Sequence, residues 1–279
     1  MIIDFHAHIF PDSVRSDRTP YLERDATFSH LYSDPKARLS SAQQLVERMD
    51  RDGIDVAVIL GMGWQVHEFA VETNSYILES AAAFPDRLVP FCTVNPATGE
   101  AAVVEVERCA GLGARGIGEL HSYAQGYRLD DERIMGPMME VAIARDLIVL
   151  THSSEPVGHI YAGKGTVTPD ELCRFIEMFP EARIVCAHWG GGLPFYALMP
   201  EVSEALRNVY FDSAASPFLY KPDVFSNAVN LVGADKVLFG TDYPLISHKR
   251  LLAQVESQPL DAKTRAAILG GNARKLLGL

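Results

Sequence analysis

Short apolar runs alternate with longer segments of helical periodicity along the whole chain. The runs are rich in Val, Ile and Leu and mostly apolar on both faces, which is typical of strands in a covered parallel sheet. We predict strands at Met1–Phe5, Val56–Leu60, Leu88–Val94, Ala114–Leu120, Ile148–Thr151, Arg183–Ala187, Val209–Asp212 and Val237–Gly240. Helices are predicted near residues 40–52, 69–84, 99–110, 131–145, 169–179, 194–206, 222–232 and 262–270.

This alternation predicts the fold class. Eight strand–helix units with no second zone of composition indicate an α/β protein, a single-domain (β/α)8 TIM barrel over residues 1–279. The alternative is an open doubly wound sheet, but no Gly-x-Gly-x-x-Gly turn follows the first strand. Residues 10–39 form a long polar insertion after that strand. Because loops that follow barrel strands lie on the face of barrel active sites, we expect a lid or substrate wall there.

Composition narrows the class of partner. Hydrophobic residues make up 48% of the 279 residues, which excludes a disordered chain. The net charge of −11 argues against wholesale binding of nucleic acid or anionic membrane, so we expect a small-molecule substrate. No apolar run approaches the ~20 residues of a membrane span. The four cysteines lack Cys-x-x-Cys spacing and no leader-like segment is seen, so we expect a reduced, cytoplasmic protein.

Ionisable side chains gather at the predicted strand ends. His6 and His8 end the first strand and share one of its faces, because side chains alternate along a strand. Further residues of this kind stand at the ends of four later strands: Glu119, His121, His152, His188 and Asp242. In a closed barrel these ends converge on one mouth. Buried ionisable groups are costly unless they are paired or bind a metal, so we expect a metal site there.

The order His-x-His, His, His, Asp along the chain resembles the amidohydrolase superfamily of metal-dependent barrels. More narrowly, it resembles amidohydrolase family 2, the branch of aminocarboxymuconate-semialdehyde decarboxylase and its relatives. The matching segments are Asp4–His8, Thr151–His152, Ala187–Gly191, Phe239–Pro244 and Gly271–Gly278. The resemblance spans nearly the whole chain. Its motifs are highly specific for the superfamily and much less specific for the reaction.

The donor types agree with this resemblance. Three neutral imidazoles and one carboxylate suit zinc or a similar divalent ion with an open position for water. We therefore expect His6, His8, His152 and Asp242 to be ligands. The resemblance implies that Asp242 also takes a proton from metal-bound water, whose pKa a metal can lower to about 7. We expect His188 to hydrogen-bond that water or the substrate as acid, base or electrostatic stabiliser.

Glu119 departs from the commonest pattern of the superfamily. Many members carry a carboxylated lysine at the end of strand four, where it bridges two metals, and TatD-like deoxyribonucleases carry Glu in a similar Gly-Glu context. Glu119 could therefore bind or bridge a second ion, or it could orient a ligand histidine. One ion and two ions both stay open. By alternation with Glu119, His121 is expected to line the same pocket.

Several functions fit this residue set. The first is hydrolysis of an ester, lactone or amide by metal-activated water, with Asp242 and His188 moving protons. The alternative is non-oxidative decarboxylation, or hydration, of a small unsaturated or aromatic acid, as the resemblance to this branch implies. A TatD-like nuclease is suggested only by Glu119 and is disfavoured by the acidic charge. Barrels of this branch are often dimers, so the resemblance leaves a homodimer open.

Overall fold

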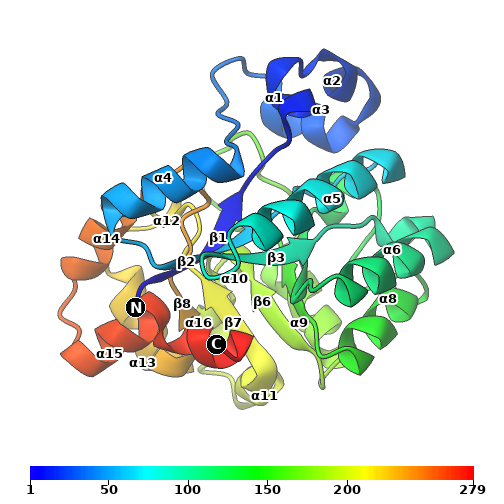
Figure 1. The fold of residues 1–279 in the computed structure, drawn as a ribbon. Helices are drawn as coiled ribbons and strands as arrows, with labels where there is room; N and C mark the ends of the chain where they lie inside the picture. Colours follow the sequence, from blue (N-terminus) through cyan, green and yellow to red (C-terminus); the bar gives the residue numbers. More distant parts are fainter.

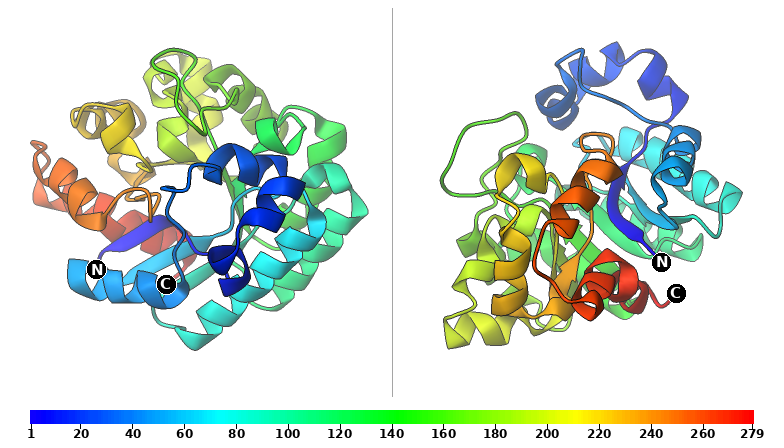
Figure 2. Two further views of the ribbon diagram at one scale, coloured as in Figure 1. Left: turned by 90° about the horizontal axis from the view of Figure 1, so that it is seen from above. Right: turned by 90° about the vertical axis from the view of Figure 1, so that its left-hand side faces the viewer.

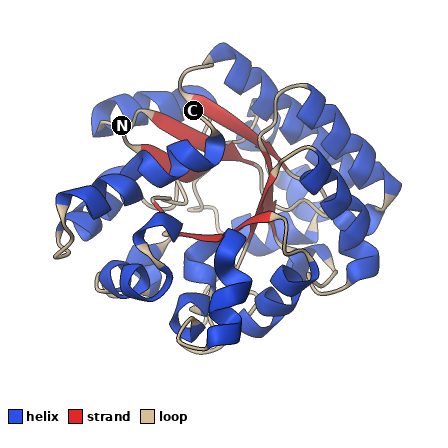
Figure 3. Ribbon diagram, turned by 90° about the horizontal axis from the view of Figure 1, so that it is seen from below, coloured by secondary structure: helices blue, strands red, loops and turns tan.

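The computed structural model describes residues 1–279 and confirms the predicted barrel. Eight parallel strands follow one another in sequence order around it, with helices on the outside (Figures 1 and 3). The strands are β1 (Ile3–His8), β2 (Val56–Leu60), β3 (Leu88–Cys92), β4 (Gly116–Leu120), β5 (Ile148–Thr151), β6 (Arg183–Cys186), β7 (Val209–Asp212) and β8 (Val237–Leu238). Backbone hydrogen bonds between β1 and the residues after β8 close the ring, with Phe5 N 2.8 Å from the Phe239 oxygen.

The outer layer contains most of the predicted helices with small shifts at their ends, but two predictions were too long. Residues 194–206 form a 3-10 turn (Leu193–Tyr196) and a six-residue helix, and residues 262–270 form a five-residue helix followed by a π-helical turn (Ala267–Gly271). The helices of the outer layer are α4 (Ala42–Asp52), α5 (His67–Ala83), α6 (Glu100–Gly111), α8 (Glu132–Ala144), α9 (Pro169–Met178), α11 (Pro200–Ala205), α13 (Val224–Val232), α14 (His248–Glu256), α15 (Ala262–Ala266) and α16 (Asn272–Leu277). Among these helices, sequence analysis missed α14 and α16. In α14, two of the four buried positions are the polar His248 and Gln254, which weakens the apolar pattern. No helix has the length and apolarity needed to cross a membrane. All four cysteines are free.

Two breaks in strand register aim the functional side chains. The pairing of β1 with β2 shifts between Asp4 and Ala7, and the pairing of β4 with β5 shifts between Ile117 and Leu120. Around the first break, Phe5 packs in the cluster inside the barrel, whereas Ala7 packs in the outer one. Bulges of this kind re-aim side chains beside active sites. Here they lie at His6 and Glu119.

The insertion differs from the long loop that we expected. Residues 10–39 contain three short helices, α1 (Asp12–Ser16), α2 (Thr19–Arg24) and α3 (Ala26–Tyr32), which lie over the barrel opening (Figure 2). An aromatic cluster joins them to the segment after β2, with the rings of Phe28 and Trp64 stacked at 5.1 Å. Helices of five to seven residues have little stability alone, so tertiary packing forms them.

Asp25 anchors the insertion and offers a test of this packing. Its Oδ1 accepts a hydrogen bond from Phe28 N at the start of α3, and its Oδ2 accepts from Gln65 N and Val66 N at 2.8 and 2.9 Å. Because Asp25→Ala leaves these amides without partners, we expect unfolding free energy to fall by at least about 2 kcal/mol in chemical denaturation. Asp17→Ala removes an exposed bond to Thr19 and is the matched control, expected to cost less than about 1 kcal/mol. Equal losses would contradict the anchoring role.

Candidate metal centre

The structure brings every predicted site residue to one chamber at the barrel mouth. His6 and His8 come from β1 and Glu119 from β4, while the others follow β4, β5, β6 and β8: His121, His152, His188 and Asp242. Six of these side chains are at most 7% exposed, and Asp242 is the most open at 16%. Asp242 therefore forms the face of the cluster nearest the mouth.

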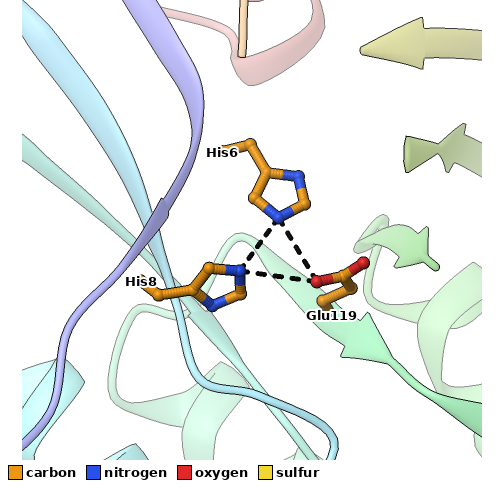
Figure 4. Close-up of side chains that lie close together, drawn as sticks. All are labelled: His6, His8 and Glu119. Atoms are coloured by element: carbon orange, nitrogen blue, oxygen red, sulfur yellow. Dashed lines mark hydrogen bonds and ion pairs between the residues drawn. The ribbon is translucent and has the colours of Figure 1, made fainter. Parts of the chain in front are cut away.

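One group of donor atoms gathers around one oxygen of Glu119 (Figure 4). His6 Nε2 and His8 Nε2 lie 3.0 Å apart, and Glu119 Oε2 lies 3.3 and 3.4 Å from them. Asp242 Oδ1 completes the group at 3.3 Å from His8 Nε2. Donor atoms about 2.0–2.1 Å from one ion in a tetrahedron are about 3.3 Å apart, so this spacing fits a shared divalent cation.

A second group surrounds the other oxygen of the same carboxylate. His152 Nδ1 lies 3.0 Å from Glu119 Oε1, and His188 Nε2 lies 3.3 Å from it. Glu119 thus stands between two sets of donors, one facing each oxygen. This differs from the sequence-based ligand set, which put His152 together with His6 and His8. A carboxylate in this position has the geometry to bridge two ions.

Hydrogen bonds behind the imidazoles set which nitrogen faces the centre. His188 Nδ1 lies 3.0 Å from the Ala214 carbonyl oxygen, which can only accept, so this nitrogen carries a proton and Nε2 faces Glu119. His6 Nδ1 donates to Asp212 Oδ2 at 2.8 Å. His152 Nε2 lies 3.2 Å from Ser154 Oγ. Such partners orient metal-binding histidines and raise their basicity.

Asp212 is a candidate site residue that sequence reasoning missed. It is the last residue of β7, and its Oδ1 accepts from the backbone amides of His188 and Ala214 at 3.1 and 3.0 Å. These bonds hold the turn after β6, where His188 adopts the left-handed conformation with φ of 55°. The available signal was its position, an acidic residue at the same end of a strand as the other site residues.

The ionisable side chains in the chamber shift one another's pKa values. Burial opposes ionisation of Glu119, but the surrounding histidines hold the pKa of its carboxyl well below the usual range. Burial likewise opposes ionisation of Asp242, yet its hydrogen bond with His8 lowers its pKa. Burial disfavours protonation of His188, while the hydrogen bond and charge of Glu119 raise its pKa to about 9. The two carboxylates are therefore ionised at neutral pH and attract cations.

His121 lines the chamber as predicted, in a position suited to orienting Glu119. Its Nδ1 accepts from Gly63 N at 3.2 Å, so in the neutral ring the proton is on Nε2, 3.5 Å from Glu119 Oε2. Burial lowers the pKa of His121 to about 3, which keeps the ring neutral. The ring also stacks on that of His152 at 5.0 Å.

Aromatic side chains from the insertion and from α7 (Ser122–Gln125) wall the mouth. Tyr123 of α7 has its ring 5.5 Å from His152 and 5.9 Å from His30 of α3. Burial, followed by the charges of Asp242 and Glu119, raises the pKa of Tyr32 at the end of α3. The insertion therefore borders the chamber through His30, and the phenol of Tyr32 stays protonated.

Comparisons with known proteins find relatives along nearly the whole chain. The amidohydrolase family profile matches residues 3–279. A 2-amino-3-carboxymuconate-6-semialdehyde decarboxylase of Dictyostelium discoideum is 24% identical over 273 residues, 84% of this chain and 76% of that protein. A gamma-resorcylate decarboxylase of Polaromonas sp. is 21% identical over 298 residues, 88% of this chain and 90% of that protein.

Solved structures share the fold at low identity. The 5-carboxyvanillate decarboxylase of Novosphingobium aromaticivorans, a complex with manganese and 4-hydroxy-3-methoxy-5-nitrobenzoic acid, has a TM-score of 0.82 at 20% identity. The match covers 100% of this chain and 96% of that one. The dihydroxybenzoic acid decarboxylase of Polaromonas sp., with bound manganese and 2-nitroresorcinol, has a TM-score of 0.78 at 20% identity, over 100% and 97% of the chains. With a family profile matched along nearly its whole length, the chain belongs to the amidohydrolase family.

Proposed function

We propose that this protein is a metal-dependent carboxy-lyase that releases carbon dioxide from a small aromatic or unsaturated acid. The supporting observation is that the two curated relatives, each aligned over more than four fifths of this chain, are both decarboxylases. From the sequence alone we placed hydrolysis first and decarboxylation second. The relatives favour the reverse order, and the chamber is compatible with it because it combines ionised carboxylates, proton-carrying imidazoles and an aromatic wall.

The donor arrangement supports a specific metal assignment. His6, His8 and Asp242 would hold one divalent ion together with Glu119 Oε2, and Glu119 Oε1, His152 and His188 would hold a second. Zinc suits these nitrogen and oxygen donors, and manganese is the ion present in two related structures. A bound ion would supply the positive charge that orients the carboxylate of the acid.

The chain's own residues would then bind the acid and supply a proton. When the carbon–carbon bond breaks, carbon dioxide leaves and the remaining carbon takes one proton in its place. Asp242, which is ionised at rest, is the best-placed group to take this proton from solvent and pass it to the carbon, because it is the most open member of the cluster. If only the first ion is bound, His188, on the far side of Glu119, is free to act as a second proton carrier. The phenol of Tyr32 stays protonated and can donate a hydrogen bond to a substrate oxygen.

The test separates carbon dioxide release from acid release. We expect Mn²⁺-loaded protein to release carbon dioxide from at least one member of a panel of hydroxybenzoates, benzene dicarboxylates and unsaturated diacids, measured with a coupled assay. Chelator should abolish the signal and added Mn²⁺ should restore it. Lactones and esters, followed by acid release in the same buffer, are the control panel. Acid release without any carbon dioxide would contradict the proposal.

Hydrolysis is the second candidate, and Glu119 is the observation that favours it. A carboxylate between two donor groups suits a pair of ions about 3.5–4 Å apart, an arrangement that many hydrolases use to activate water. With His188 holding the second ion, Asp242 would move protons to and from the attacking water. Activity on the lactone and ester panel alone would establish this function in place of decarboxylation.

A further inference from the structure

A fully buried ionic cluster lies behind the candidate metal centre, between β1, α4 and α14. His248 is the first residue of α14 and is 0% exposed. Its Nε2 lies 3.0 Å from Asp4 Oδ2, and its Nδ1 lies 3.4 Å from Asp52 Oδ2. The ring of Tyr243 stacks on the imidazole at 5.4 Å with an interplanar angle of 8°. The reaction proposed above uses none of these side chains.

Asp4 connects this cluster to two of the metal-facing residues. Its Oδ1 accepts hydrogen bonds from His6 N at 3.1 Å and from Thr241 N at 2.9 Å. Its Oδ2 accepts from Thr241 Oγ1 at 2.5 Å. Asp4 therefore joins the bulge in β1 at His6 to the residue directly before Asp242.

The backbone conformation around Asp242 depends on the hydrogen bonds of Thr241 and His6. Thr241 Oγ1 accepts from Tyr243 N at 3.1 Å, and Asp242 N donates to the His6 carbonyl oxygen at 2.8 Å. Asp242 adopts the left-handed conformation with φ of 63°. Non-glycine residues keep this conformation only where their surroundings impose it. Here the bonds through Asp4 and Thr241 impose it on both sides.

The side chains paired with the two carboxylates single out His248. Asp52 has cations of its own, with Arg48 Nε at 2.6 Å and Lys249 Nζ at 3.8 Å. Asp4 is paired with no Lys or Arg, and His248 is its only side chain of basic type. A buried carboxylate that loses such a partner is left uncompensated and would be expected to move.

We propose that His248 is a positioning residue of the metal centre, which it serves by holding Asp4 in place. Asp4 accepts hydrogen bonds from the backbone amides of His6 and Thr241. These bonds keep the side chains of His6 and Asp242 close enough to bind the same ion. This inference rests on the metal centre proposed above. It does not depend on the choice between decarboxylation and hydrolysis.

The test measures metal binding and folding separately. We expect His248→Leu to weaken Mn²⁺ binding to the purified metal-free protein by about tenfold or more in isothermal titration calorimetry. The visible absorption spectrum of the Co²⁺-loaded variant should also change, because the ligand arrangement changes. Leu251→Ala is the matched control. Leu251 is buried in the same helix one turn further on, so its loss should lower the melting temperature and leave Mn²⁺ affinity unchanged.

Thr241→Val provides a second route if His248→Leu does not fold. It keeps the shape of the side chain and removes the hydroxyl that donates to Asp4 and accepts from Tyr243 N, and it should weaken Mn²⁺ binding in the same direction. In the double variant the two effects should be non-additive, because both act through Asp4. Wild-type Mn²⁺ affinity in both single variants, or an equal loss in Leu251→Ala, would overturn the positioning role. Wild-type protein that binds no Mn²⁺ would overturn the metal centre and this inference together, whereas Mn²⁺ binding without carbon dioxide release would overturn only the decarboxylase proposal.

Discussion

Replacing Asp242 with asparagine is expected to lower kcat by a factor on the order of 10³, with little loss of stability. Asparagine tolerates the left-handed backbone of this position, so the turn after β8 should keep its shape. The amide cannot carry the proton that the reaction needs, and it removes a negative charge from the donor group at His8. Both losses act on the chemical step.

Steady-state kinetics on the acid identified by the panel would measure this effect, with thermal unfolding as the check on folding. Asp223→Asn, at an exposed position before α13, is the control and should leave kcat unchanged. A variant at position 242 that retains a tenth or more of wild-type kcat would show that the proton comes from another group. His188 would then be the next residue to replace.

Replacing Glu119 with glutamine is expected to reduce the number of Mn²⁺ ions bound per chain by one and to lower kcat by a factor of about 10² or more. Glu119 is the only residue whose atoms belong to both donor groups. A neutral amide offers one oxygen instead of two, so it cannot serve both groups. Metal content after equilibrium dialysis, measured by elemental analysis, would report the change directly.

Glu105→Gln is the matched control for this variant. Glu105 is also a buried glutamate, but it pairs with Arg108 in the outer layer, far from the donor groups. Its replacement should reduce stability without changing metal content. If Glu119→Gln bound as many ions as the wild type, Glu119 would orient the histidines without being a ligand.

Local signals in the sequence were sufficient to predict the barrel and to predict which residues meet at its mouth. Each strand is a short apolar run between polar segments, and that signal does not depend on distant residues. A closed parallel barrel brings all carboxyl strand ends to one mouth, so the positions of His6, Glu119, His152 and Asp242 along the chain already implied that they meet.

The arrangement inside that mouth depended on contacts between residues far apart in the sequence. Register breaks in β1 and β4 aim His6 and Glu119, and they exist only in relation to the neighbouring strands. The three helices of the insertion form by packing against Trp64, and helices this short carry too weak a periodicity to be predicted.

For the same reason, sequence analysis assigned no role to two further residues. Asp212 and His248 act through His6 and Asp4, which lie at the opposite end of the chain. The residue types at the strand ends thus predicted a metal site in a barrel. Only the folded chain places Glu119 between two donor groups, because distances of 3.0–3.5 Å are set by packing and register and not by spacing along the sequence.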